Sequence, residues 1–398
     1  MPDIVVLGGG FAGLWSAVAA ARLNRLAGGG LDIALVTPQE DLVLRPRLYE
    51  ADPGGMRAPL DRVLRPVGVT RIRGEARALD HGARTVTITG PDGAERSLGY
   101  RRLVLATGST LRRPDIPGAR YLHDVDTLPA AVALDEHLRA LPDAPPGPER
   151  FTAVVVGAGF TGLEVATELV GRLGAVAGAE RPRVVLVDRS PVVGAALGPG
   201  PRPVIEDALA RLGVETLLGR SLGRIGPDRA VLDDGTVVPA RTVVWTAGVV
   251  ASPLTAQLPG DRDATGRLLV DEELRVPGAP EVFAAGDTAA APVEPGRRTL
   301  PSCQHAMPLG RFAGHNAAAD LLGRPAVPFA TKPYTTCLDL GAAGAVLTTG
   351  WERTVRLTGE PARARKRTIV EQWIYPPLDD ATAIMEAADI SRPVPQAV

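Results

Sequence analysis

Two copies of a glycine-spaced motif constrain the fold of this chain more than any other feature. The first, Gly8-x-Gly10-x-x-Gly13, follows the apolar run "DIVVLG" and precedes the helical pattern "LWSAVAAARLNRL". A second buried strand, "LDIALVT" at 31–37, completes a βαβ unit. The same order returns at 153–188, with Gly157-x-Gly159-x-x-Gly162 and the strand "RVVLVD". Two such units predict an α/β protein with two Rossmann-like domains.

Each glycine of the motif has a separate physical task. The first permits the tight turn, the second lets a pyrophosphate approach the backbone, and the third lets helix and strand pack closely. The N-terminus of the helix then faces the phosphate charge. The strand and helix around each copy favour dinucleotide binding over an ordinary glycine-rich turn.

The chain length, a proline-rich stretch and the hairpin patterns suggest where the domain boundaries lie. A chain of 398 residues exceeds one hydrophobic core, and "LPDAPPGPE" at 141–149 reads as a linker. Hairpin patterns precede the strand exits "VLATGS" and "VVWTAG", the second around Asp234-Gly235, and "EVFAAGD" ends a further strand. We expect a discontinuous dinucleotide domain at 1–118 and 256–330, a second at 119–255, and a small α+β C-terminal domain at 331–398.

The two copies differ at the residue that would hold the ribose. An acid is expected at the end of the second strand, but Thr37 stands there in the first copy, so the hydroxyl of Thr37 or the carboxylate of Glu40 is the candidate. Asp188 closes the matching strand of the second copy. A carboxylate there repels a 2′-phosphate, which favours NADH over NADPH, although the adjacent Arg189 softens that preference.

Composition excludes several function classes. The net charge of −1 gives no field that would attract nucleic acid. Two cysteines, Cys303 and Cys337, are too few for a disulfide scaffold, and the histidine and cysteine spacings fit no zinc pattern. No secretory signal or membrane-spanning run is present in the sequence, so a cytoplasmic protein is expected.

The chain resembles the two-dinucleotide-binding-domain flavoproteins, and among them the type II NADH:quinone dehydrogenases. The resemblance rests on "VVLGGGFAGL", "LVLATGS", "VVVGAGFTGLEVATEL", "TVVWTAGVVASPL" and "GRLLVDEELRVPGAPEVFAAGD". It implies that the first loop holds FAD and the second holds NADH. The expected cofactor-binding residues are Gly8, Gly10, Phe11, Ala12, Gly13, Thr37, Ala106, Thr107, Gly108, Gly157, Gly159, Phe160, Gly162, Asp188, Gly248, Gly286, Asp287, Gln304, His305 and Ala306.

Two carboxylates and an amide are the candidate catalytic groups. Glu164 and Glu168 are four residues apart and share one helix face. In the family this helix runs beside the nicotinamide, where a carboxylate orients the amide or relays protons. We expect the larger role for Glu168. The alternative is a solvated helix face.

The segment "CQHAMPLG" at 303–310 matches the part of the family that lies near the flavin and the quinone acceptor. Relatives have two glutamines here, and this chain keeps Gln304 but has Pro308 at the second position, which leaves the acceptor open. Pro308 suits the first turn of a helix over "LGRFAGHNAAADLL". Its N-terminus, with Gln304 and His305, would favour a reduced flavin. A Cys303–His305 nucleophilic pair or a redox pair with Cys337 is disfavoured.

These features predict an FAD-dependent NADH dehydrogenase with a small-molecule acceptor, a quinone among the candidates. The alternatives are a soluble NAD(P)H:acceptor reductase or metabolite dehydrogenase, and a slow redox-sensing flavoprotein. "PARARKRTIVEQWIY" at 361–375 places Ile369 with Trp373 and Val370 with Ile374 on one helix face. That face is expected to pack within the C-terminal domain or in a homodimer, with peripheral contact at the inner face of the plasma membrane as the alternative.

Overall fold

The first glycine motif lies in a six-stranded sheet, and the computed structural model describes residues 1–392. The strand order is β20-β21-β9-β1-β2-β5, parallel except for the edge strand β20. These strands are β1 (Ile4–Leu7), β2 (Ile33–Thr37), β5 (Thr70–Arg73), β9 (Arg102–Leu105), β20 (Arg275–Val276) and β21 (Ala279–Ala284). The sheet therefore joins two segments distant in sequence, as the predicted discontinuous domain requires.

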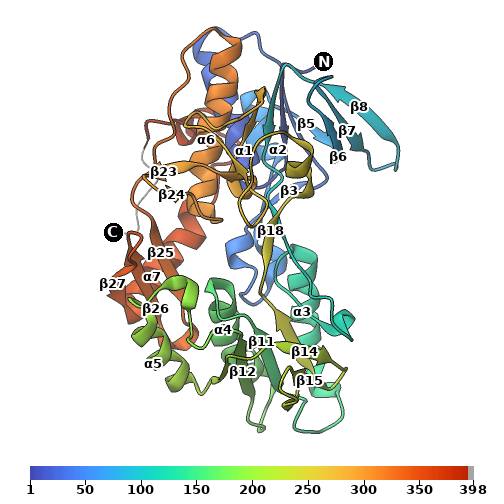
Figure 1. The fold of residues 1–398 in the computed structure, drawn as a ribbon, viewed down its shortest axis with the longest axis vertical. Helices are drawn as coiled ribbons and strands as arrows, with labels where there is room; N and C mark the ends of the chain where they lie inside the picture. Colours follow the sequence, from blue (N-terminus) through green and yellow to red (C-terminus); the bar gives the residue numbers. More distant parts are fainter. Residues whose placement is uncertain (393–398) are drawn as a thin grey trace.

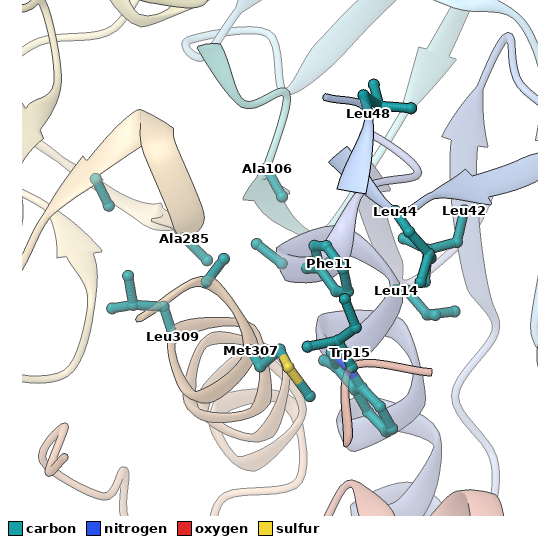
Figure 2. Close-up of a cluster of buried hydrophobic side chains, with 14 of the residues drawn as sticks. Phe11, Leu14, Trp15, Leu42, Leu44, Leu48, Ala106, Ala285, Met307 and Leu309 are labelled. Atoms are coloured by element: carbon teal, nitrogen blue, oxygen red, sulfur yellow. The ribbon is translucent and has the colours of Figure 1, made fainter. Parts of the chain in front are cut away.

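Two helices pack closely beside this sheet, α1 (Phe11–Leu26) and α6 (Cys303–Leu321). The contact depends on glycines of α6. A Cβ on Gly310 would lie 2.3 Å from the carbonyl oxygen of Ala12, and one on Gly314 would lie 1.9 Å from that of Ser16. Buried side chains including Phe11, Trp15 and Met307 fill the core here (Figure 2). Any larger residue at either glycine would force the helices apart.

The second glycine motif lies in a four-stranded parallel sheet with the order β13-β12-β11-β17. Its strands are β11 (Thr152–Val156), β12 (Arg183–Asp188), β13 (Glu215–Leu218) and β17 (Thr242–Trp245), and its helices are α3 (Leu128–Ala140), α4 (Phe160–Val176) and α5 (Arg202–Leu212). Figure 1 shows this sheet at the opposite end of the molecule from the first. The predicted fold class, with two Rossmann-like units, is confirmed.

Smaller elements complete the two units and connect them. Antiparallel sheets are formed by β6 (Glu75–Asp80), β7 (Thr85–Thr89) and β8 (Glu95–Gly99), and by β14 (Leu222–Ile225), β15 (Arg229–Leu232) and β16 (Val237–Pro239). The predicted turn around Asp234-Gly235 joins β15 to β16. Between the two main sheets, β10 (Ser109–Leu111) pairs with β18 (Val249–Ala251). Other short elements are β3 (Asp41–Val43), β4 (Arg57–Pro59), α2 (Asp61–Leu64), β19 (Leu268–Leu269), β22 (Ala289–Ala290), β23 (Pro292–Glu294) and β24 (Arg297–Arg298).

The C-terminal part is a three-stranded antiparallel sheet with helices. It contains β25 (Thr335–Asp339), β26 (Ala345–Thr349), β27 (Thr354–Thr358), α7 (Gly359–Thr368), a π-helical turn (Ile369–Trp373) and α8 (Ala381–Ala387). β25 and the turn after it contact α4, where a Cβ on Gly341 would lie 2.6 Å from the carbonyl oxygen of Thr167. The domain boundaries given above stay a prediction, and residues 393–398 lie outside the described residues.

Candidate functional site

One large cavity, with a volume of about 1940 Å³, reaches both glycine motifs. Gly8, Gly10 and Phe11 line it from the first unit, and Phe160 and Glu164 line it from the start of α4 in the second unit. Typical sites for one small molecule have volumes of about 300–1,000 Å³. The cavity therefore has room for two ligands that meet between the sheets.

The first glycine loop has the geometry that its sequence predicts. Gly8 has φ +108°, which favours glycine, and a Cβ there would lie 2.3 Å from the Ala106 carbonyl oxygen. A Cβ on Gly10 would have no atom within 4 Å, and this residue faces the cavity, so its backbone is open to a ligand. A Cβ on Gly13 would lie 1.8 Å from the carbonyl oxygen of Gly8. The third glycine thus lets α1 pack on the loop.

The second loop repeats this geometry closely. Gly157 has φ +112°, Gly159 faces open space, and a Cβ on Gly162 would lie 1.7 Å from the carbonyl oxygen of Gly157. These glycines themselves lie outside the lining of the cavity, which meets this unit at Phe160, one residue into α4. The two loops are equivalent in construction, so the same class of ligand group suits both.

Polar groups at the strand ends complete the first half of the cavity. Ala106, Thr107 and Gly108 follow β9 and line it, as do Gly286 and Asp287 after β21. Ser109 donates a hydrogen bond of 2.7 Å to Asp287. The hydroxyl oxygen of Thr107 is buried without a hydrogen-bond partner in the described chain. Because buried polar atoms are normally paired, this hydroxyl indicates a ligand at the strand end.

The structure does not support Thr37 as the ribose-binding residue. Its side chain is fully buried behind the loop, 2.7 Å from the Cβ position of Gly9. Its hydroxyl donates a 2.6 Å hydrogen bond to the side chain of Gln39. Gln39 and Glu40 line the cavity instead. Glu40, the second residue that the sequence offered, is the one placed to face a ligand.

Asp188 ends β12 as predicted, and backbone groups fix its carboxylate. Its two oxygens accept hydrogen bonds of 2.6 Å from the N–H of Ala158 and 2.7 Å from the N–H of Ser190. The side chain is half-buried beside the second loop and lies outside the cavity lining. Gly248 also lies outside the lining, and its neighbour Val249 takes its place there.

Helix α6 begins five residues earlier than the sequence predicts. Its first residue is Cys303, and the Ser302 side chain caps it by accepting a hydrogen bond from the N–H of His305. Pro308 therefore lies inside the helix rather than in its first position. As the sixth residue of the helix it lies past the first turn, so its missing N–H leaves the carbonyl of Gln304 without its i→i−4 hydrogen bond. The N-terminus lies at the cavity, where Cys303, Gln304 and Ala306 line the wall.

His305, expected at the pocket, lies behind the cavity wall. Its ring is buried, its Nδ1 lies 3.0 Å from the Leu300 carbonyl oxygen, and it stacks on Tyr334 at 4.6 Å between ring centroids. It is not part of the cavity lining. Burial lowers its pKa to about 4, so the imidazole is neutral at pH 7. His305 is a packed core residue.

Gln304 links the cavity wall to the C-terminal sheet. Its amide pairs with the N–H and the carbonyl of Thr335. An amide carries two N–H donors, so one remains for a molecule in the cavity. The sequence placed Gln304 at the pocket correctly but could not show this second contact.

The two glutamates of α4 differ in burial and in their position relative to the cavity. Glu164 is buried, lines the cavity, and forms an ion pair of 2.7 Å with Lys366 of α7. It also accepts a hydrogen bond of 3.1 Å from the N–H of Asp339. Glu168 is only half-buried and lies outside the lining. Glu164 is therefore the one of the two carboxylates that faces the cavity.

Burial controls the protonation of this pair. It raises the pKa of Glu164 to about 7, although Lys366 acts in the opposite direction. For Lys366, burial lowers the pKa, but contact with Glu164 outweighs it and the net pKa is raised. Sequence reasoning missed Lys366. Its one signal was rarity, because Lys332 is the only other lysine in the chain.

Neither cysteine has the environment of a reactive thiol. Both line the cavity without forming a disulfide. Burial raises the pKa of Cys303 and raises that of Cys337 to about 12, so both stay protonated at pH 7. Within residues 1–392, no cluster of three or more histidine, cysteine, aspartate or glutamate side chains could hold a metal.

The apolar pairs of the 361–375 segment face inward. Val370 and Ile374 are buried, Ile369 and Trp373 are half-buried, and all four line the cavity. This agrees with the expectation that the face packs within the protein rather than on a membrane. Across residues 1–392, no helix has the length and apolar character needed to cross a membrane.

Comparisons with known proteins agree with this geometry. The family model described as pyridine nucleotide-disulphide oxidoreductase matches residues 2–310. An NADH dehydrogenase-like protein of Mycobacterium tuberculosis is 46% identical over 404 residues, covering 100% of both chains. The demethylphylloquinone reductase NdbB of Synechocystis is 29% identical over 384 residues, covering 94% of this chain and 92% of its own.

Solved structures show the same fold at low sequence identity. The structure of NDH2 from Plasmodium falciparum in complex with NADH matches with a TM-score of 0.79 at 12% identity, covering 97% of this chain and 96% of its own. The sulfide:quinone oxidoreductase of Aquifex aeolicus matches with a TM-score of 0.73 at 20% identity, covering 94% and 91%. Both span the C-terminal part as well as the two sheets.

Proposed function

The chain belongs to the pyridine nucleotide-disulphide oxidoreductase family, and from that premise we propose that it is an FAD-dependent NADH dehydrogenase that reduces a quinone. The observation that carries the proposal is the cavity that runs from the first glycine loop to the start of α4 beside the second loop. The names of the mycobacterial and cyanobacterial relatives support the donor and the acceptor. Bound FAD would accept a hydride from NADH and pass two electrons to the quinone.

The first loop is proposed to hold FAD. The open backbone at Gly10 and the N-terminus of α1 suit its pyrophosphate. The unpaired hydroxyl of Thr107 and the carboxylate of Asp287 offer a donor and an acceptor beside it. The start of α6 offers the free N–H of Gln304 and the positive end of a helix dipole. Together these groups fit a flavin dinucleotide.

The second loop is proposed to hold NADH. Asp188 is held by backbone N–H groups at the end of β12, where it can accept hydrogen bonds from ribose hydroxyls. The same charge disfavours the 2′-phosphate of NADPH. Phe160 lines the cavity at the start of α4, between this loop and the first unit. A nicotinamide ring would therefore enter the cavity from this side.

Glu164 is proposed to move protons at the meeting point of the two ligands. Reduction of a quinone to a quinol consumes two protons. A carboxyl with a pKa of about 7 can give up and regain a proton at neutral pH. Lys366 holds this carboxyl in place through the 2.7 Å ion pair. Glu168, one turn further along α4, is proposed to connect Glu164 with solvent because it is partly exposed.

Rapid kinetics on the purified protein test this proposal. Its visible spectrum should show bound flavin, NADH should bleach it under anaerobic conditions faster than NADPH, and 2-methyl-1,4-naphthoquinone should restore it. A colourless protein unable to bind FAD would refute the whole proposal. Rapid bleaching without recovery in quinone would support instead a soluble reductase with another acceptor. Very slow bleaching by both nucleotides would support a redox sensor.

Location and assembly are further proposals. A lipid-soluble quinone would be met at a membrane surface, and Arg363 and Arg367, four residues apart on α7 and partly and fully exposed, form a basic patch. We propose peripheral contact through this patch at the inner face of the plasma membrane. Sedimentation with anionic lipid vesicles, absent with neutral vesicles, tests the contact, and size-exclusion chromatography tests the expected homodimer.

A further inference from the structure

A buried guanidinium without a partner lies on α6, apart from the glycine loops and the Glu164–Lys366 pair. Arg311 is 6% exposed and lines the cavity. Its Nε is buried without a hydrogen-bond partner, and its guanidinium forms no hydrogen bond or ion pair with any side chain or backbone group in residues 1–392. A buried charge is normally paired, because leaving it unpaired costs several kcal/mol.

The neighbours of Arg311 do not neutralise it. Its guanidinium lies over the Trp15 ring, 5.0 Å from the centroid, and the indole N–H of Trp15 is also buried without a partner up to residue 392. The carboxylate of Asp389 acts on Arg311 from a distance, but Arg22 and the Ser391 N–H engage it. Burial, followed by the repulsion from Arg392, lowers the pKa of Arg311 to about 10, which still leaves it charged at pH 7.

The residues just before Arg311 on α6 are apolar, and apolar side chains of the C-terminal part line the same cavity. Met307 and Pro308 precede Arg311 on the same helix, and Val370 and Ile374 line the cavity from the C-terminal part. Figure 2 shows Trp15 and Met307 within one cluster of buried side chains. Arg392 also lines the cavity. Arg392 is exposed and pairs with Glu386 at 3.7 Å, so the buried guanidinium of Arg311 is the cation that an anionic group on a flat apolar molecule would meet in this wall.

The distance along α6 suits a ring-sized acceptor. Arg311 lies seven residues after Gln304, or about 10 Å along the axis. Helical side chains lean toward the N-terminus, so the guanidinium comes nearer to the level of Pro308. Pro308 offers no donor of its own. Arg311 is therefore the group on this face of α6 that can bind an oxygen of a molecule extending away from Gln304.

We propose that Arg311 is a specificity-determining residue that selects quinones bearing an anionic oxygen substituent on or beside the ring. The inference rests on the proposed quinone-reducing function and narrows its substrate class. A charge-assisted hydrogen bond at a buried site favours such a ligand over an uncharged quinone of the same size by about tenfold or more. Trp15 supports the interaction from beneath the guanidinium.

Equilibrium dialysis of the oxidised holoprotein at pH 7.5 tests the proposal directly. The probes are 2-hydroxy-1,4-naphthoquinone, which is ionised at this pH, and 2-methyl-1,4-naphthoquinone, which is not. The wild-type protein should bind the anionic probe at least about tenfold more tightly. Arg311→Met should lose this preference while its Kd for the neutral probe changes by less than about threefold. Arg311→Lys should retain part of the preference.

Two controls keep the result decisive. Arg324→Met removes an exposed arginine just beyond the end of α6 and should leave both dissociation constants unchanged. Arg311→Met should keep or raise the unfolding midpoint, because it replaces an unpaired buried charge with an apolar chain. A lowered midpoint with weaker binding of both probes would indicate a packing role and overturn the proposal. Equal preference in wild type and Arg311→Met would also overturn it.

Failure of the broader function remains distinguishable from failure of this inference. If NADH bleaches the flavin but neither quinone restores it, the quinone-reductase proposal fails. The dialysis result does not depend on turnover and still decides whether Arg311 recognises the anion. If quinones restore the flavin but the two probes bind equally well, only the role of Arg311 is refuted.

Discussion

Replacing Lys366 with methionine removes the cation of a buried ion pair while keeping much of the apolar side chain. The N–O distance to Glu164 is 2.7 Å, and the two side chains are 7% and 5% exposed. Breaking such a pair by removing one partner costs about 3–5 kcal/mol. The carboxylate left behind can escape this cost only by binding a proton. The loss of stability should therefore depend on pH.

The sign follows from the raised pKa of Glu164, about 7 in the intact pair. A carboxyl whose pKa is higher in the folded state stabilises the protein below its unfolded pKa, and this contribution is lost as the pH rises. In the wild type this loss of stability ends near pH 7, because Lys366 allows Glu164 to ionise there. In Lys366→Met the loss of stability should continue to about pH 9, because the carboxyl no longer has a cation beside it. Two pH units at 1.36 kcal/mol each give about 2.7 kcal/mol.

Urea unfolding at pH 6 and pH 9 measures this difference. The free energy of unfolding of Lys366→Met should be lower than that of the wild type by about 3–5 kcal/mol at pH 9 and by only about 1–2 kcal/mol at pH 6. Arg367→Met, on the exposed side of the same helix, is the matched control and should change little at either pH. The double variant with Glu164→Gln should lose the pH dependence. An equal loss at both pH values, or a larger loss at pH 6, would refute the reasoning.

Three further predictions concern FAD binding, nucleotide selectivity and proton transfer by Glu164. Gly10→Ala should leave the folded protein intact, because no atom lies within 4 Å of its Cβ position, but it should weaken FAD retention. Gly13→Ala should instead lower the thermal midpoint by several degrees, because its Cβ would lie 1.8 Å from the Gly8 carbonyl oxygen. Absorbance spectra measure the first effect and melting curves the second. Asp188→Asn should raise the NADPH:NADH ratio of kcat/KM by about tenfold, and an unchanged ratio in steady-state assays would remove the proposed basis of selectivity. The rate of flavin reoxidation by 2-methyl-1,4-naphthoquinone, measured by stopped flow, should fall as the pH rises through about 7, because Glu164 loses its proton there. Glu164→Gln should abolish this pH-dependent fall, and Glu168→Gln should change the rate less.

Local sequence rules were enough for the architecture and for the two loops. Gly8 and Gly157 adopt the left-handed conformation that the motif implies, and Gly13 and Gly162 make the close approach to the first glycine. These features depend on residues within six positions of one another. Their geometry is therefore determined by short stretches of chain, and the order of strands and helices follows from the same patterns.

The site was harder to predict because its members come from distant segments. Glu164 and Glu168 are indistinguishable by spacing, and only α7 and β25 determine which one is buried. His305 follows Gln304 directly, yet its ring turns to Leu300 and Tyr334. Thr37 ends the right strand, but Gln39 takes its hydroxyl. Helix α6 starts earlier than predicted because Ser302 caps its N-terminus, and this cap outweighs the preference of proline for a first turn.

The sequence by itself determined the two βαβ units, the phosphate-binding turns and the carboxylate at the end of β12, since each depends on neighbours along the chain. Tertiary structure alone decided which side chains carry charge into the cavity. Glu164 meets Lys366 across 202 positions of sequence, and Arg311 has no hydrogen-bond or ion-pair partner among residues 1–392 in a wall built from separate parts of the chain. Burial and pairing set the protonation of these groups, and both arise only when distant segments pack together.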